Sequence, residues 1–214
     1  VIYTRKTDVF VKLRERARIA NKADADLFVS IHCNAHHTQA SGTETFVVGV
    51  GNTKRNLDIA KEENEVIFLE DDHEEHYEGF DPNSPASIIG LTLMQEEYVD
   101  QSIMLANLIE TNFSKLNKRK SRGVKQASLW VMHNTYMPSV LIETGFITNK
   151  KEGAYLNSKA GQTQISNSIV TSILEYKQNI GKGTVAPTEV LINDRASVHE
   201  GVIFKVQLAA SSKD

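Results

Sequence analysis

Apolar residues follow two different spacings along the chain, and together these spacings predict alternating strands and helices. Short continuous apolar runs such as LFVSIH and SVLIETGF are typical of strands that are buried on both faces of a sheet. Apolar positions three and four residues apart are typical of amphipathic helices. The expected strands are residues 1–4 (the end of a strand), 27–32, 43–48, 127–132 and 138–146. The expected helices are residues 8–23, 56–65, 93–116 and 160–176.

This alternation predicts an α/β fold, in which a mostly parallel twisted sheet is flanked by helices in three αβα layers. Thr7 or Asp8 is expected to cap the first helix, because a short polar side chain accepts well from the first free N–H groups. Residues 118–123, KRKSRG, have the composition of a basic turn. In the last helix we expect a buried stripe of Ile165, Ile169, Ile173 and Leu174.

The composition changes after Gly181, and this change predicts a domain boundary. Residues 181–201 contain the Gly, Pro and Ser of a linker, and residues 202–214 alternate like the first strand of another small domain. The main domain therefore spans about residues 1–180. The first residues, VIYTRKTD, show no signal-peptide pattern and are typical of the interior of a domain, so we expect a chain that is cut at both ends.

Composition and charge limit the classes of function. Hydrophobic residues make up 40% of the chain and charged residues 24%, as in globular proteins, and no apolar run is long enough to span a membrane. The single cysteine, Cys33, excludes an internal disulfide and a cysteine-based zinc finger. The net charge of −3 combines −10 over residues 58–81 with +7 over the rest. A basic body suits an anionic polymer, or is an ordinary solvated surface, but no RNA-binding or helix-turn-helix motif indicates nucleic acid as a partner.

Two polar residues stand where apolar strands are expected to end. LFVSIH ends at His32, and SVLIETGF carries Glu143, so parallel strands would bring both to one sheet edge. Imidazole is a good zinc ligand, and a carboxylate beside zinc is suited to general acid–base catalysis. A hydrogen-bonded structural histidine and a salt-bridged glutamate are the alternatives. Cys33 is expected to point to the opposite face as a small buried residue. Asn34 is a candidate for orienting the site, or a turn former.

Three stretches resemble the zinc-dependent N-acetylmuramoyl-L-alanine amidases of the Amidase_3 family, which cleave peptidoglycan. They are TRKTDVFVKLRERARIANKADADLFVSIHCNA, SGTETFVV and SRGVKQASLWVMHNTYMPSVLIETGFITNKKE, in this order over about residues 1–180. The resemblance implies a zinc ion held by two histidines and a glutamate, with a second glutamate as base. His32 in SIHCNA matches one zinc ligand and Glu143 in ETGF matches the base.

The resemblance also implies what surrounds this chain and what it acts on. The other two ligands, the first strand and its glycine-rich turn are expected upstream of Val1, so residues 1–214 alone are expected to bind zinc weakly and to be inactive. The implied reaction is hydrolysis of the amide bond between N-acetylmuramic acid and L-alanine in peptidoglycan, in the periplasm or cell envelope and during cell division. A signal peptide is expected upstream. GVIFKVQLAAS resembles the opening strand of a SPOR domain, which binds peptidoglycan.

Residues 52–100 contain the acidic excess and are expected to form a regulatory insertion. Some amidases of this family carry an insertion here that covers the zinc cleft until a protein activator displaces it. The glutamate that occupies the open zinc position in such a covered cleft would be Glu62, Glu63 or Glu65, and the sequence does not distinguish among them. The alternative is an acidic surface loop. For the whole protein, the alternatives to an amidase are a non-catalytic peptidoglycan-binding or regulatory module on the same scaffold, and another zinc hydrolase such as a peptidase.

Overall fold

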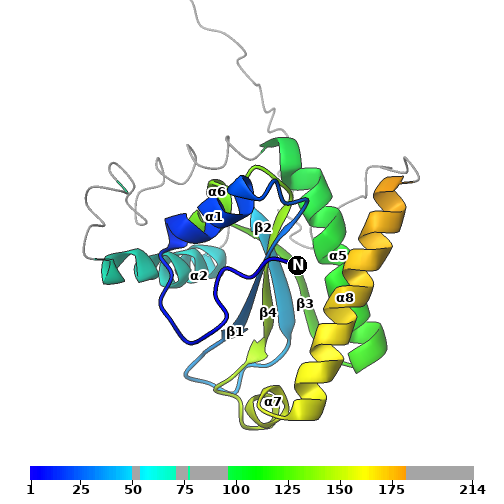
Figure 1. The fold of residues 1–214 in the computed structure, drawn as a ribbon. Coiled ribbons are helices and arrows are strands. Elements are labelled where there is room, and N and C mark those ends of the chain that lie inside the picture. Colours follow the sequence, from blue (N-terminus) through cyan, green and yellow to red (C-terminus); the bar gives the residue numbers. More distant parts are fainter. Residues whose placement is uncertain (50–53, 71–76, 78–95, 182–214) are drawn as a thin grey trace, which may run out of the picture.

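A central sheet of four strands organises the computed structural model, which describes residues 1–49, 54–70, 77 and 96–181 (Figure 1). The strand order is β1-β4-β2-β3. The β1–β4 and β2–β3 pairs are parallel and the β2–β4 pair is antiparallel, which confirms the expected mostly parallel sheet. The strands are β1 (Phe28–Asn34), β2 (Thr43–Val48), β3 (Ser121–Ala127) and β4 (Ser139–Phe146).

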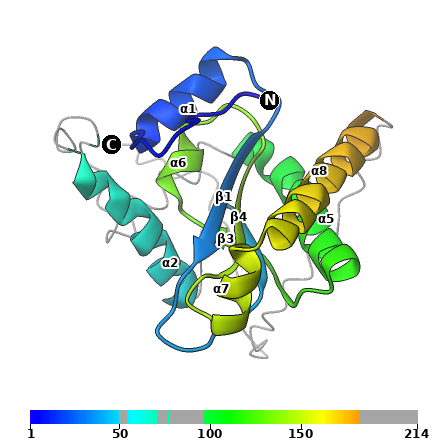
Figure 2. The same cartoon turned by 60° about the horizontal axis from the view of Figure 1, so that its bottom comes forward.

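Helices cover both faces of the sheet and complete the three layers (Figures 1 and 2). One face is covered by α1 (Leu13–Lys22), α2 (Lys54–Asn64) and the short α6 (Trp130–His133). The other face is covered by α5 (Val99–Asn117) and α8 (Lys159–Gly181), and α7 (Lys150–Leu156) follows β4. Two short 3₁₀ helices are η1 (Glu65–Leu69) and η2 (Glu96–Tyr98).

The hydrophobic core has one part on each face of the sheet. Phe46 and Leu141 pack toward α1, α2 and α6, whereas their neighbours Val47 and Ile142 pack toward α5 and α8. All four side chains are fully buried. Successive residues of a strand point to opposite faces, so a strand that is covered twice needs an unbroken apolar run. This is the pattern from which the strand 138–146 was predicted, whereas the strand 43–48 was predicted from the alternation of TETFVV.

The first helix begins later than the sequence predicts. It starts at Leu13, and Lys12 at its N-cap makes no side-chain capping bond, so the expectation of a cap at Thr7 or Asp8 is wrong. The backbone N–H of Leu13 instead donates to the Glu70 carboxylate at 3.0 Å. A carboxylate 57 residues away thus stabilises the positive end of this helix.

The sequence around β3 was assigned wrongly. The expected basic turn is the beginning of β3, and the expected strand 127–132 contains only the end of β3, because residues 130–133 are helical. β3 is an edge strand whose residues up to Gln126 are only half-buried, so it tolerates a polar sequence. Leu129 and Met132 reach the core from the connection and from α6 instead of from a strand.

Three smaller expectations also differ from the structure. Residues 1–4 form no strand. Leu174 is 55% exposed on α8, where Ser172 and Tyr176 continue the buried stripe of Ile165 and Ile169. Cys33 is exposed because β1 lies at the sheet edge.

None of the helices in the described ranges combines the length and the apolar character that crossing a membrane requires. Residues 182–214, with most of the expected linker and the SPOR-like segment, lie outside the described residues.

Candidate functional site

His32 and Glu143 are neighbours across the β1–β4 pair. The two residues are register partners in parallel strands, and therefore their side chains leave the same face of the sheet. This is the face that α1, α2 and α6 cover, because Leu141, two residues before Glu143, packs there. Thr144 fixes the register further, since its hydroxyl donates to the His32 carbonyl at 2.8 Å. The structure thus brings together His32 and Glu143, the two residues that the sequence pattern predicts to lie at one edge of the sheet.

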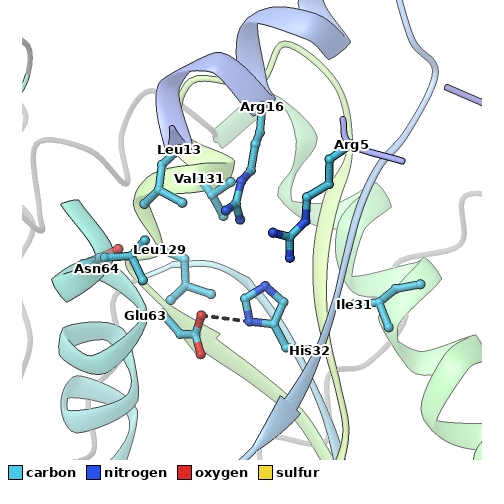
Figure 3. Close-up of a pocket in the computed structure, with 10 residues that line it drawn as sticks. Arg5, Leu13, Arg16, Ile31, His32, Glu63, Asn64, Leu129 and Val131 are labelled. Atoms are coloured by element: carbon cyan, nitrogen blue, oxygen red, sulfur yellow. Dashed lines mark ion pairs between the residues drawn. The ribbon is translucent and has the colours of Figure 1, made fainter. Parts of the chain in front are cut away.

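A cavity of about 270 Å³ opens beside His32 (Figure 3). His32 and Glu63 lie on one side of it, and the guanidinium groups of Arg5 and Arg16 point into it from the N-terminal segment and α1. The apolar part of its wall comes from Leu13, Val66, Leu129 and Val131. The cavity therefore combines a metal-binding imidazole, a carboxylate and two cationic side chains on an apolar floor.

Glu63 is the acidic residue of α2 that reaches the site. Its Oε2 lies 2.9 Å from Nδ1 of His32, and the two side chains are 26% and 27% exposed (Figure 3). Glu62 and Glu65, the other two candidates, are exposed. The structure thus distinguishes Glu63 from its neighbours by position.

Asn64 holds the end of α2 in the orientation that directs Glu63 to His32. Its Nδ2 donates to the Ser128 carbonyl at 2.9 Å, and its Oδ1 accepts from the Trp130 N–H at 2.8 Å. The Asn64 side chain is 2% exposed. Ile59, Ala60 and Ile67 pack in the core on both sides of this anchor. The α2–η1 part of the expected insertion is therefore built into the domain, whereas most of residues 71–95 lies outside the described residues.

The site has the donor set and the spacing that suit a zinc ion. One ligand atom from each of His32, Glu63 and Glu143 lies within 4.8 Å of the others. Zinc prefers imidazole nitrogen and carboxylate oxygen at about 2.0–2.2 Å, so two ligands of a tetrahedral ion are about 3.4 Å apart. Small side-chain adjustments bring the three atoms to that spacing. The residues present therefore fit a metal ion, with His32 as the softest donor.

Glu44 is a buried acidic residue of the site that the sequence analysis did not select. It is the register partner of Glu143 on the other side of β4 and is 0% exposed. Asn34 donates to its Oε1 at 3.1 Å, and Arg122 Nε lies 3.4 Å from its Oε2. Asn34 thus contacts Glu44 rather than the metal-ligand candidates. A glutamate inside a strand with the pattern TETFVV was the available signal, because it shares a face with buried Phe46.

An ion pair supports the turn that follows Glu143. Arg119 and Glu152 pair at 2.6 Å with side chains 7% and 16% exposed, and Glu152 also accepts from the Phe146 N–H at 2.8 Å. Gly145 lies against this pair with φ +140°, and a Cβ there would overlap Nη2 of Arg119. Only glycine fits both the backbone and the space.

The other histidines that the structure describes do not join the cluster. His36 and His37 are exposed in the loop after β1, with ring centroids 4.2 Å apart. His133 is buried, and its Nε2 lies 3.0 Å from the Ser128 hydroxyl. His73 and His76 lie outside the described residues.

Comparison with known proteins identifies the family. The sequence model of Amidase_3, described as N-acetylmuramoyl-L-alanine amidase, matches residues 1–175. The chain belongs to this amidase family. AmiA, an amidase of Escherichia coli (strain K12), is 29% identical over 177 residues, which are 81% of this chain and 59% of AmiA. YqiI of Bacillus subtilis (strain 168) is 31% identical over 175 residues, which are 82% of this chain and 63% of YqiI. The chain thus spans about three-fifths of the length of these relatives.

Solved amidase structures share the fold. The N-acetylmuramoyl-L-alanine amidase from Clostridium difficile 630 superimposes with a TM-score of 0.57 at 24% identity, covering 81% of this chain and 69% of that one. The catalytic domain of CwlV from Bacillus (Paenibacillus) polymyxa gives a TM-score of 0.56 at 24% identity, covering 83% of this chain and 72% of that one. The resemblance seen in the motifs therefore extends to the three-layer architecture.

Proposed function

We propose that the full-length protein is a zinc-dependent amidase that hydrolyses the bond between N-acetylmuramic acid and L-alanine in peptidoglycan, in the periplasm or cell envelope. The observation that carries this proposal is the register of His32 and Glu143, which lie side by side, with His32 lining a cavity of about 270 Å³. Membership of the amidase family supports the reaction class. A binding module without catalysis would not require a buried glutamate beside a metal-binding histidine.

In this proposal His32 binds zinc and Glu143 is the general base and acid. When bound, zinc polarises the scissile carbonyl and lowers the pKa of a water to about 7. Glu143 accepts a proton as the water oxygen bonds to the carbonyl carbon, and donates it to the L-alanine nitrogen when the C–N bond breaks. The two residues are positioned by hydrogen-bonded strands, and such rigidity favours a fixed reaction geometry. The remaining ligands are expected from the segment upstream of Val1.

Glu63 closes the site in the resting protein in this proposal. Its carboxylate pairs with the imidazole nitrogen of His32 at 2.9 Å and lines the cavity that the substrate has to enter. A protein activator that binds the segment around residues 66–95 would pull Glu63 away and open the cavity. Such control requires that the closed conformation be the more populated one at rest.

The test is hydrolysis of dye-labelled peptidoglycan by the purified full-length protein, with mass spectrometry of the released peptides. We expect free peptides that begin with L-alanine, loss of activity on treatment with a chelator, and recovery on addition of zinc. His36→Ala is the matched control for His32→Ala, because His36 is an exposed histidine outside the cluster. If neither the wild type nor Glu63→Ala releases peptide while both bind the polymer, the non-catalytic module is the correct function.

A further inference from the structure

Two arginines face the cavity opposite the His32–Glu63 pair, and the proposed reaction does not use them (Figure 3). Arg16 is half-buried on α1, and its Nε donates to the Val11 carbonyl at 3.0 Å. Arg5 is exposed, and its Nη1 donates to the Val9 carbonyl at 2.9 Å. A guanidinium has five N–H donors, so each arginine keeps further donors for a ligand in the cavity. These hydrogen bonds to backbone carbonyls hold the two guanidinium groups in place.

The charges in the cavity favour an anion. Burial first, and then the neighbouring Arg5 guanidinium, lower the pKa of Arg16, whereas the Glu63 carboxylate acts in the opposite direction. Guanidinium groups carry a positive charge in proteins, so two cations face the cavity. The ion pair that Glu63 makes in the cavity is with His32. The half-buried Arg16 guanidinium thus lies near a second cation, Arg5, and an anionic ligand relieves their repulsion.

We propose that Arg5 and Arg16 form a carboxylate-binding subsite, which binds an acidic group of the stem peptide while the scissile amide lies at His32 and Glu143. This inference rests on the proposed function and deepens it by naming the part of the substrate that the cavity recognises. The peptide side of the scissile bond has carboxylates on the acidic residue after L-alanine and at the peptide C-terminus. The planar guanidinium fork matches a carboxylate with two parallel hydrogen bonds.

The subsite has a measurable consequence for specificity. An uncharged amide in place of the carboxylate leaves the half-buried Arg16 and the exposed Arg5 without an anionic ligand, and a site built for a polar group rejects an analogue that lacks it. Hydrogen bonds to charged groups are worth enough to lower kcat/KM by about 10- to 100-fold when they are lost. The loss is expected mainly in KM, since the carboxylate is remote from the reacting atoms.

The experiment uses the full-length protein and three soluble muropeptides. The first has both carboxylates free, the second has the acidic residue after L-alanine amidated, and the third has the C-terminus amidated. The variants are Arg16→Gln, Arg16→Lys and Arg5→Gln, and the matched control is Arg14→Gln, an exposed arginine of the same helix. Isothermal titration with the peptide product that begins with L-alanine, in acid and amide forms, measures binding independently of turnover.

We expect the wild type and Arg14→Gln to prefer the free acid by about 10- to 100-fold, and Arg16→Gln to lose that preference. Arg16→Lys keeps the charge without the fork and should be intermediate. The amidated peptide that loses affinity identifies which carboxylate is bound. Equal effects of Arg16→Gln on acid and amide substrates would overturn the subsite, and so would an equal rise in both basal rates, which would assign the arginines to holding Glu63. If no variant cleaves any substrate, the proposed function fails, and the titration still decides the subsite.

Discussion

Glu143 is 1% exposed and lies between two polar neighbours, His32 on β1 and Glu44 on β2. Three polar side chains in adjacent strands thus form one row across the covered face of the sheet. Asn34 and Arg122 hold Glu44, whereas His32 and Glu143 lie within reach of Glu63, which lines the cavity. The row therefore joins a glutamate that is fixed by hydrogen bonds to the two residues to which the proposal assigns the chemistry.

Glu143→Gln tests the role of the base with almost no change in shape. We expect kcat of the full-length protein to fall by about 10²- to 10⁴-fold, since an amide cannot accept the proton from water. Zinc content, measured by plasma mass spectrometry, should stay the same, whereas His32→Ala should lose zinc. A loss of zinc in Glu143→Gln would instead make Glu143 a metal ligand.

Glu63→Ala tests whether the carboxylate beside His32 closes the site. If the closed conformation is favoured by about 10:1 to 100:1, its removal raises basal hydrolysis by a similar factor. Glu62→Ala is the matched control, because Glu62 is the exposed neighbour in the same helix. The measurement is release of dye from labelled peptidoglycan without an activator. Lower activity together with lower zinc content in Glu63→Ala would show that Glu63 is a permanent ligand.

The sequence could predict some of the residues of the candidate site but not all of them. His32 and Glu143 end apolar runs, and this local signal is visible in one dimension. Glu63 could not be separated from Glu62 and Glu65, because the choice depends on how Asn64 bonds to the β3–α6 connection 64 and 66 residues away. Glu44 was missed because the local signal, its position two residues before Phe46 in TETFVV, does not show the pairing with β4 from which its burial follows.

At the scale of elements, the end of β4 depends on Gly145 and the Arg119–Glu152 pair. Glu152 on α7 accepts from the Phe146 N–H of β4 and from the Gly42 N–H before β2, so one carboxylate joins α7 to the ends of two strands. Arg119 reaches it from the residues after α5. The strand end that carries Glu143 is therefore held from outside the site.

Gly145→Ala should damage this support. The positive φ costs about 1–3 kcal/mol for a residue with a side chain, and the Cβ also displaces Arg119. Gly123→Ala is the control, because Gly123 has φ +83° but nothing within 4 Å of its Cβ position. We expect Gly145→Ala to lower the melting temperature more than Gly123→Ala, at about 2–4 °C for each kcal/mol. It should also lower kcat, and equal melting temperatures would contradict the role of the ion pair.

Elements were predictable where their own sequence determines them. β4 has the continuous apolar pattern of a strand that is covered on both faces, and β2 has an alternating pattern. Both were predicted at nearly their observed bounds. The start of β3 was predicted as a turn because an edge strand needs few apolar residues. The residues of α6 were predicted as part of a strand because the core accepts apolar side chains such as Leu129 and Met132 from either kind of element. The start of α1 depends on Glu70, which lies far away in the sequence.

At the scale of the whole molecule, the two faces of the sheet differ in the polar groups that they bury. The face under α1, α2 and α6 contains the cavity with His32, Glu63 and the two arginines. The face under α5 and α8 contains another buried carboxylate, Glu110, which is 5% exposed. It accepts from Thr43 at 2.9 Å and from Thr45 at 2.7 Å, and Ser121 also donates to it. Glu110 thus joins α5 to β2 and β3.

The titration of Glu110 should make the stability of the fold depend on pH. Burial raises the pKa of Glu110 above 4.5, although the Ser121, Thr45 and Thr43 hydroxyls act in the opposite direction. Above the ordinary carboxyl pKa the unfolded chain has lost this proton while the folded protein keeps it, so the folded state binds more protons. The Glu110 contribution to stability is therefore complete at low pH and decreases as the pH rises through the raised pKa.

Glu110→Gln isolates this contribution, because glutamine keeps the shape and an acceptor oxygen but does not titrate in this range. We expect the free energy of unfolding of the wild type, relative to that of Glu110→Gln, to fall as the pH rises from the ordinary carboxyl pKa of 4.5 through the raised pKa of Glu110. Urea unfolding of both proteins at several pH values measures the difference, with Asp100→Asn as the control for an exposed carboxylate of the same helix. A difference that stays constant would mean that Glu110 is ionised in the folded protein. The three hydroxyl groups would then be sufficient to hold a charge beneath the sheet.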